Sequence, residues 1–205
     1  DKVLLAELYS EKRDPVPLER IPAYLKAALV ATEDRKFYKH SGVDLKGIAR
    51  AIIKDLQAGK FVEGASTITQ QLAKTLFLTS RKTVVRKIKE AILAFQLERR
   101  YTKDEILELY LNQVYFGSGA YGVKSAAKMF FNKSVRDLSL AECALIAGMP
   151  KSPSRFSPLI NEGLALKRRN IVLGQMWATG IISAENYNQA VVEEIRIGKK
   201  SKNLT

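Results

Sequence analysis

Cysteine and histidine are almost absent from this 205-residue chain. Cys143 is the only cysteine and His40 is the only histidine. An internal disulfide is therefore excluded, and so is a zinc site that needs two cysteines or several histidines. Any Ser-His-Asp triad would have to use His40.

Long apolar runs are also missing. No stretch approaches the 18 apolar residues that a membrane-spanning helix needs, and no signal peptide is visible. The chain starts at Asp1 without a methionine, so we expect a piece of a longer protein whose anchor lies outside it. An apolar share of 46% and a charged share of 27% are ordinary for a globular protein. The length suits one domain, with room for two lobes.

Acidic residues are too few to balance the basic ones. The chain has 34 Lys and Arg against 21 Asp and Glu, which gives a net charge of +13. Residues 74–103 carry nine basic residues and only two acids, Glu90 and Glu98, so this stretch holds +7 of that charge. Such a surface attracts nucleic acid, anionic lipid head groups or phosphorylated substrates. Composition does not choose among these three.

Apolar periodicity and capping signals predict a mainly helical protein. Thr102 with Glu105, and Ser139 with Glu142, form capping-box patterns. Asp44 is a predicted cap. Glycine-rich loops are expected over residues 59–64, 115–122 and 149–158, and a weak strand over residues 3–8. Helices are expected over residues 23–33, 44–58, 66–78, 82–100, 106–114, 143–147, 163–178 and 183–195.

Glu33 is the first candidate for chemistry. It ends a predicted apolar helix and opens a polar segment that runs to Gly42. A carboxylate at such a junction is partly desolvated, which raises its pKa toward the working range of a general base. A plain helix-end carboxylate that pairs with Arg35 or Lys36 fits the same pattern.

The segment Gly64–Gln71 combines a glycine, hydroxyl side chains and two adjacent amides. Ser66 or Thr67 can cap the helix that follows, and the free N–H groups there can hold a phosphate. Glutamine amides suit sugar hydroxyls because they both donate and accept. An ordinary capped helix with a polar face is the alternative. Adjacent glutamines cannot share one helix face, so we expect them to have different roles.

Arg86, Lys87 and Glu90 fall on one helix face at spacings of three and four residues. A carboxylate inside a cationic cluster stays ionised and can orient the cations, or a metal, against a diphosphate. A solvated basic face is the alternative.

Two further segments are interpreted as structural when taken alone. In residues 103–113 the apolar positions are core, and Glu108 and Asn112 share a face. Arg168 and Arg169, on a predicted amphipathic helix, are expected to bind carboxylates or another lobe. Apolar residues that flank the Ser-Thr-Gln segment either belong to local core or dip into a bilayer interface.

Taken together and in order, five segments resemble the motifs of the peptidoglycan glycosyltransferases of family 51. This family forms the N-terminal catalytic module of class A penicillin-binding proteins or stands alone as monofunctional enzymes. The similarity covers about residues 18–195 and shows no departure at any motif position. The segments are Glu33–Gly42, Gly64–Gln71, Arg86–Glu90, Lys103–Asn112 and Arg168–Leu173.

The resemblance implies a mainly α fold, with a lysozyme-like large lobe and a smaller membrane-facing jaw lobe around residues 50–85. Residues 1–195 would form the glycosyltransferase domain, and 196–205 a linker toward a C-terminal transpeptidase domain. The implied location is the extracytoplasmic face of the bacterial inner membrane. The implied partners are lipid II, lipid-linked glycan and the membrane surface, without nucleic acid. No cofactor or protein-held metal is required, although a divalent cation at the diphosphate stays open.

The resemblance also implies roles for residues in an inverting transfer that makes β-1,4 glycan from lipid II. Glu33 matches the base that takes the proton of the acceptor 4-hydroxyl, and Glu90 matches the second carboxylate. For an inverting reaction we expect these two to lie farther apart than the roughly 5–5.5 Å of retaining enzymes. The positions implied for substrate binding are Arg50, Ser66, Gln71, Lys74, Arg86 and Lys87, with the cations on the leaving diphosphate.

Three rival functions stay open at this point. A lysozyme-like hydrolase or lytic transglycosylase shares the helical cleft but has no need of a cationic diphosphate site. A nucleic-acid-binding module fits the charge, yet the scattered aromatics supply no stacking platform. A membrane-surface scaffold would not depend on Glu33.

Overall fold

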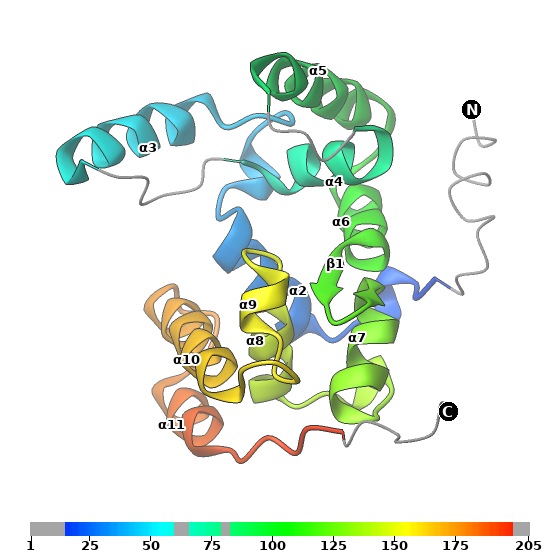
Figure 1. Cartoon of the computed structure of the whole chain (residues 1–205), viewed down its shortest axis with the longest axis vertical. Coiled ribbons are helices and arrows are strands. Elements are labelled where there is room, and N and C mark those ends of the chain that lie inside the picture. Colours follow the sequence, from blue (N-terminus) through cyan, green and yellow to red (C-terminus); the bar gives the residue numbers. More distant parts are fainter. Residues whose placement is uncertain (1–14, 60–65, 79–82, 199–205) are drawn as a thin grey trace.

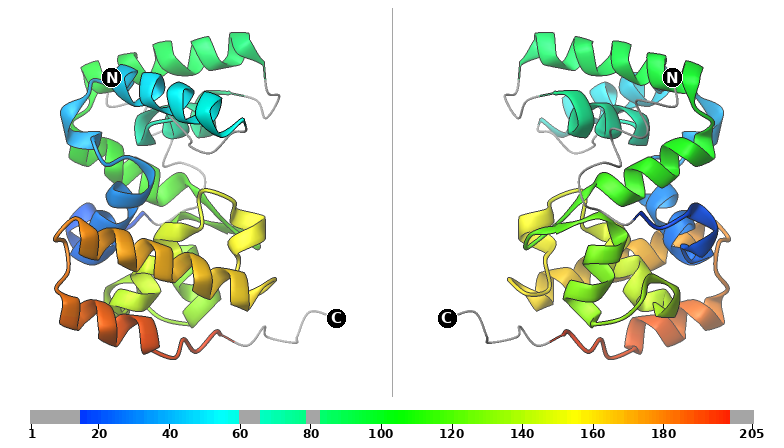
Figure 2. Two further views of the ribbon diagram at one scale, coloured as in Figure 1. Left: turned by 90° about the vertical axis from the view of Figure 1, so that its left-hand side faces the viewer. Right: turned by 90° about the vertical axis from the view of Figure 1, so that its right-hand side faces the viewer.

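The helices lie in two tiers in the computed structural model, which describes residues 15–59, 66–78 and 83–198 (Figure 1). The upper tier holds α3, α4 and α5, and the lower tier holds α2 and α7 to α11. Helix α6 runs between them, and both side views show the same division (Figure 2). The upper tier consists of α3 (Leu45–Ala58), α4 (Ile68–Phe77) and α5 (Val84–Arg100). The other helices are α2 (Ala23–Glu33), α6 (Lys103–Gln113), α7 (Gly122–Phe131), α8 (Leu140–Gly148), α9 (Pro153–Phe156), α10 (Glu162–Ala178) and α11 (Ala184–Val192).

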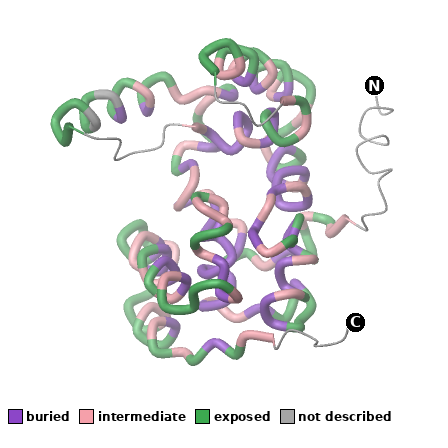
Figure 3. The backbone as a smooth tube through the Cα atoms, in the orientation of Figure 1, coloured by how far each residue is buried: buried purple, intermediate pink, exposed green. Residues whose placement is uncertain are grey.

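The core of the lower tier is built around α8. Its residues 141–148 are all buried, because this segment is apolar on every side apart from Glu142. Helices α2 and α10 pack against it. Each fully buried Leu or Ile side chain contributes about 1.5–3 kcal/mol relative to an exposed one. Buried residues, drawn in purple in Figure 3, run through the middle of the lower tier and continue up α6.

Local capping chemistry fixes where most helices begin, as predicted. Asp44 accepts a hydrogen bond from the Gly47 N–H at 2.9 Å at the start of α3. Both predicted capping boxes are present, at the starts of α6 and α8. Each side-chain cap satisfies an N–H group that the helix itself leaves unpaired.

The predicted loop over residues 115–122 is wrong, because this segment forms a β-hairpin. Strands β1 (Tyr115–Gly117) and β2 (Ala120–Tyr121) pair antiparallel, with Tyr115 opposite Tyr121. The turn between them has positive φ at Gly117, Ser118 and Gly119. Glycine adopts such angles without strain, which explains why a glycine-rich segment reverses direction here. Helix α7 follows at once and was not predicted.

The structure also differs from the prediction in the loop over residues 149–158 and at the end of the last helix. Short helix α9 lies within the predicted loop 149–158. The last helix ends at Val192 rather than 195, because the guanidinium of Arg169 donates to the carbonyls of Val191 and Glu193 at 2.6 and 2.8 Å. These bonds hold the chain extended beyond the helix. The predicted strand at 3–8 and most of the loop 59–64 lie outside the described residues.

The upper tier exposes large apolar side chains. Along the outer side of α5, Val84, Val85, Ile88, Ile92 and Phe95 are each more than half exposed. On α3, Leu45, Ile53 and Leu56 are exposed as well. The described residues of the predicted jaw lobe, around residues 50–85, belong to α3, α4 and the start of α5, and the division into lobes stays a prediction. Among the described residues, no helix is long and apolar enough to cross a bilayer.

Gly42 is the point where the loop after α2 meets α5. Its φ is +90°, and a Cβ atom there would lie 2.9 Å from the backbone carbonyl carbon and oxygen of Ala94. The Gly42 carbonyl also accepts a hydrogen bond from Thr67 Oγ1 at 2.6 Å. Only glycine allows this approach, so one position fixes α5 and the start of α4 relative to the loop.

We expect Gly42→Ala to lower the free energy of unfolding by about 2–4 kcal/mol, since it combines left-handed backbone strain with overpacking. Gly59→Ala is the matched control: Gly59 also has positive φ, at +62°, but a Cβ there meets nothing within 4 Å. The control should cost only about 1 kcal/mol. Urea denaturation measures both, and equal losses would contradict the close approach at Gly42.

Candidate active site

Glu33 is the last residue of α2, where the helix leaves the buried core of the lower tier. The inner side of α2 is apolar, with Leu25, Ala28 and Leu29 fully buried. The side chain of Glu33 is half-buried, so it keeps some contact with solvent. Its predicted partners, Arg35 and Lys36, do not define its position. The Arg35 side chain instead donates to the Ala31 carbonyl at 3.1 Å.

A glutamine and a tyrosine hold the carboxylate of Glu33. The Gln71 Nε2 donates to Glu33 Oε2 at 2.9 Å, and the Tyr110 hydroxyl donates to Gln71 Oε1 at 2.9 Å. These side chains come from α2, α4 and α6 in turn. Tyr110 is fully buried, and burial followed by the negative charges of Glu33 and Asp34 raises its pKa well above the usual value. Its hydroxyl therefore stays protonated and able to donate.

Burial raises the pKa of Glu33 above the ordinary glutamate value. The hydrogen bond from Gln71 and the positive charges of Arg168 and Lys151 act in the opposite direction, and Asp34 raises the pKa further. Desolvation outweighs the stabilising groups. A carboxylate with a raised pKa, close to solvent and held by a neutral donor, can serve as a general base.

Sequence reasoning missed the influence of Lys151 and Arg168 on Glu33. Arg168 belongs to the last motif and is nearly buried, and its Nε donates to the Gly148 carbonyl at 3.0 Å. Burial lowers its pKa, while Glu33 raises it. Lys151 follows α8. The adjacent Arg169 binds the backbone carbonyls of Val191 and Glu193 near the end of α11. Both arginines therefore bind backbone carbonyls within their own tier, and not the carboxylates or the other lobe that we expected.

Asp34 ties the end of α2 to the start of α4. Its Oδ2 accepts from the Ile68 N–H at 3.0 Å and from His40 Nε2 at 2.9 Å, and the residue is 8% exposed. His40 is thus a structural partner of the first loop, and its Nε2 faces Asp34. This bonding fixes the direction in which α4 departs.

The adjacent glutamines of α4 do have different roles. Thr67, rather than Ser66, caps the helix: its hydroxyl accepts from the Gln70 N–H at 3.1 Å, and Gln70 Oε1 accepts from the Thr67 N–H at 3.1 Å. Gln70 is therefore buried in a capping box, whereas Gln71 faces Glu33. Contact of Gln71 with substrate stays a prediction.

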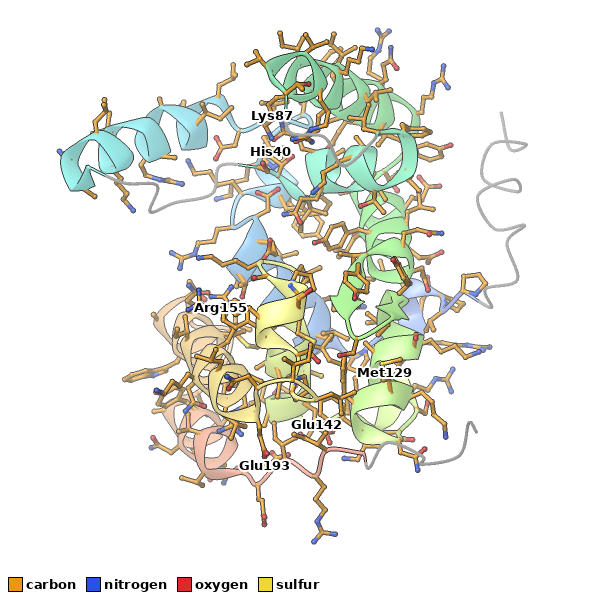
Figure 4. All side chains as sticks on the ribbon, in the orientation of Figure 1. His40, Lys87, Met129, Glu142, Arg155 and Glu193 are labelled. Atoms are coloured by element: carbon orange, nitrogen blue, oxygen red, sulfur yellow. The ribbon has the colours of Figure 1, made fainter. Side chains whose placement is uncertain are left out.

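Glu90 is the centre of a second cluster, on the inner side of α5. The side chain is almost fully buried and binds Arg86 Nη1 at 2.8 Å and the ammonium of Lys87. Lys87 Nζ also donates to Ser66 Oγ at 2.7 Å, which connects α5 to the start of α4. Lys87 extends from α5 toward the interior of the upper tier (Figure 4). The predicted shared face of Arg86, Lys87 and Glu90 is confirmed.

The structure therefore sorts the predicted site residues into two centres. Ser66, Arg86, Lys87 and Glu90 form one, and Glu33 with Gln71 forms the other. Helix α4 connects them, since Ser66 precedes its first turn and Gln71 lies within it. Lys74 is exposed three residues beyond Gln71, and Arg50 is exposed on α3. Their part in a phosphate cluster stays a prediction.

Within the described parts of the chain, no three histidine, cysteine or acidic side chains gather as they would around a metal ion.

Helix α6 has the structural role that we predicted, because its polar side chains bind the backbone of a neighbouring segment. Asn112 binds the backbone N–H and carbonyl of Val16, and Glu108 accepts from the Leu18 N–H at 2.8 Å. Cys143 is buried, and burial raises its thiol pKa to about 12, so it is inert.

The family model described as "Transglycosylase" matches residues 1–177. The chain belongs to the transglycosylase family. It is 50% identical over 181 residues to penicillin-binding protein 1F of Bacillus subtilis, which covers 88% of this chain and 25% of that protein. It is 49% identical over 195 residues to penicillin-binding protein 1A of Escherichia coli, covering 95% of this chain and 23% of the relative.

A solved structure supports the same fold. The crystal structure of penicillin-binding protein 1A from Haemophilus influenzae matches 92% of this chain and 19% of its own, with 31% identity and a TM-score of 0.57. The mainly α fold and the family, both predicted from the motifs, are confirmed. This transglycosylase chain spans about a quarter of the length of the relatives it matches.

The raised pKa of Glu33 predicts how one substitution changes stability. The folded chain binds a proton at Glu33 more readily than the unfolded chain does. Protonation of Glu33 therefore stabilises the fold, and this stabilisation is complete below the ordinary glutamate pKa. That effect is lost as pH rises through the raised pKa. We therefore expect Glu33→Gln to gain stability relative to the parent as pH rises from acid to neutral.

Thermal unfolding at a series of pH values measures this difference. Glu19→Gln is the control, because Glu19 is exposed on a short 3₁₀ turn and its replacement should change little. A difference between parent and Glu33→Gln that stays constant with pH would contradict the raised pKa.

Proposed function

We propose that this chain is a peptidoglycan glycosyltransferase. In this reaction it polymerises lipid II into β-1,4-linked glycan, with inversion at the donor anomeric carbon and release of polyprenyl diphosphate. The observation that carries the proposal is the pair of dissimilar carboxylates in a transglycosylase chain. Glu33 is half-buried beside a neutral donor, whereas Glu90 is buried between two cations.

Glu33 is the proposed base. The acceptor 4-hydroxyl attacks the donor anomeric carbon from the face opposite the leaving group, and its proton passes to Glu33. The bond from this carbon to the diphosphate oxygen breaks as the new glycosidic bond forms. A positioned base contributes about 10²–10⁴-fold in rate. The hydrogen bond from Gln71 leaves a carboxylate oxygen, Oε1, to face the acceptor.

The cluster around Glu90 is the proposed diphosphate site. Negative charge develops on the leaving diphosphate, and cations that are already held in place stabilise it without reorganising. Glu90 and Ser66 hold Lys87, and Glu90 holds Arg86. In this proposal Lys74 and Arg50 add positive charge at the same site. The cations supply the charge, so no metal is required.

The exposed apolar face of the upper tier supports work at a membrane surface. A helix that exposes apolar residues beside many cations binds anionic bilayers in two ways: its apolar side chains are buried in the interface, and its cations are attracted to the anionic lipids. We place this tier against the outer face of the bacterial inner membrane, where the lipid-linked substrates would be held. In this proposal a transpeptidase domain follows the linker in the full-length protein.

The cations held by Glu90 favour glycosyl transfer over two rival functions, hydrolysis of glycan and binding of nucleic acid. A lysozyme-like hydrolase has no diphosphate to stabilise and no need of a buried carboxylate that holds Arg86 and Lys87. A nucleic-acid-binding module needs exposed cations and stacking aromatics, whereas these two cations point inward to Glu90.

Polymerisation of lipid II in detergent tests the proposal, with Glu33→Gln beside the parent. We expect glycan polymer from the parent and a loss of at least about 100-fold from the variant, because only the proton acceptor is removed. Adding a chelator and then magnesium tests whether a divalent ion contributes. Lysis of purified cell wall without lipid II, or equal polymerisation by both chains, would overturn the proposal.

Neutralising Lys87 should slow polymerisation more than neutralising its neighbour Lys89. Lys87→Gln removes a cation held by Glu90 and Ser66, and we expect a loss of about 10²-fold or more in kcat/KM. Lys89→Gln removes the same charge from an exposed position on the same helix and is the control. Similar losses from the two variants would show a general charge effect on membrane binding instead of a diphosphate site.

A further inference from the structure

Three side chains from three helices form a row that ends at Glu33. The Tyr110 hydroxyl on α6 donates to Gln71 Oε1 on α4, and Gln71 Nε2 donates to Glu33 Oε2 on α2, each at 2.9 Å. Tyr110 is buried at 1% exposure, and α4 packs against α6. The three groups are therefore held by the fold rather than by a flexible surface.

A glutamine amide can occupy two orientations that differ by a half-turn, with donor and acceptor exchanged. An ionised carboxylate only accepts hydrogen bonds, so ionised Glu33 requires the NH₂ side of Gln71. The reversed amide would turn Oε1 toward Glu33, which suits only a protonated carboxyl that can donate. The orientation of this amide and the protonation of Glu33 are thus coupled.

We propose that Tyr110 is a positioning residue for the base: its hydroxyl donates to Gln71 and keeps the amide turned so that its NH₂ group supports ionised Glu33. This inference rests on the proposed role of Glu33 as the base. It assigns to Gln71 a task separate from any contact with substrate. Tyr110 touches neither Glu33 nor substrate in this scheme and acts only through Gln71.

Other charges also face Glu33, and they do not pass through this row. Arg168 approaches from α10, Lys151 from the segment after α8, and Asp34 follows directly in the chain. Replacing the Tyr110 hydroxyl leaves all three in place. A change in Glu33 that follows from Tyr110→Phe therefore reports on the amide.

Tyr110→Phe keeps the buried ring and removes only the hydroxyl. Without that donor the amide is free to reverse, and the hydrogen bond that lowers the pKa of Glu33 is weakened. The base must be ionised to act, so the acid limb of the pH profile of polymerisation should move to higher pH. We expect kcat/KM to fall about three- to tenfold on that limb and to change little on the alkaline plateau.

A titration followed by NMR tests the inference without any substrate. The chain is labelled with ¹³C at the glutamate carboxyls, and the Glu33 signal is assigned by its absence in Glu33→Gln. We expect the titration midpoint of Glu33 to rise in Tyr110→Phe and in Gln71→Ala. In the double variant the midpoint should equal that of Gln71→Ala, because Tyr110 acts through Gln71. Tyr115→Phe, in the β-hairpin, is the control and should leave the midpoint unchanged.

Two results would overturn the inference: an unchanged midpoint in folded Tyr110→Phe, or a double variant whose shift is the sum of the single shifts. If Tyr110→Phe does not fold, 3-fluorotyrosine at position 110 replaces it. Its more acidic hydroxyl is a stronger donor, so the midpoint of Glu33 should fall, and a rise would contradict the scheme. Absence of polymer from the parent would refute the proposed function and leave the NMR result standing.

Discussion

The carboxylate of Asp34 is the constraint on which the site depends. Its Oδ2 binds the first N–H of α4 and the ring of His40, while its backbone ends α2. Helix α4 therefore starts at a fixed place relative to Glu33, and Gln71, one turn along, arrives beside that carboxylate. The bond between Thr67 and the Gly42 carbonyl fixes the same start from the other side. Losing the Asp34 carboxylate would leave buried donors unpaired, which costs about 1–3 kcal/mol for each.

The fold gives its two central carboxylates opposite surroundings. Glu33 loses hydration and receives one direct neutral hydrogen bond, with positive charge from Arg168 and Lys151 acting on it. Glu90 is more deeply buried, but Arg86 and Lys87 bind it directly. A carboxylate that two cations bind directly serves to hold those cations in place. One whose charge is only partly compensated takes up a proton readily. Different tasks thus follow from burial and pairing, because the residue type is the same.

Features with a local cause could be predicted from sequence, and features made by distant contacts could not. The caps at Asp44, Thr102 and Ser139 involve residues three positions apart, so the pattern alone reveals them. The end of α11 depends on Arg169, more than twenty residues earlier, and it was misplaced. Glu33 and Glu90 were proposed from the motifs, and their roles stay predictions. Lys151 was missed because only folding brings its charge to bear on Glu33. Tyr110 stands inside the fourth motif, yet an apolar helix pattern gives no sign that its hydroxyl faces Gln71.

Helix α5 relates the proposed membrane surface to the proposed diphosphate site. Ile88 and Ile92 are exposed on one side of this helix, and Glu90 is buried on the other. An α-helix with its side chains is about 10–12 Å across, so the two sides are separated by roughly that thickness. In a lipid-linked substrate the diphosphate joins the polyprenyl chain to the sugar. If the outer side of α5 contacts lipid, the cations on its inner side lie where that junction enters the protein. In the proposed reaction the sugar would extend past α4 toward Glu33, so the order of groups in the substrate would match the order of the two centres along the fold.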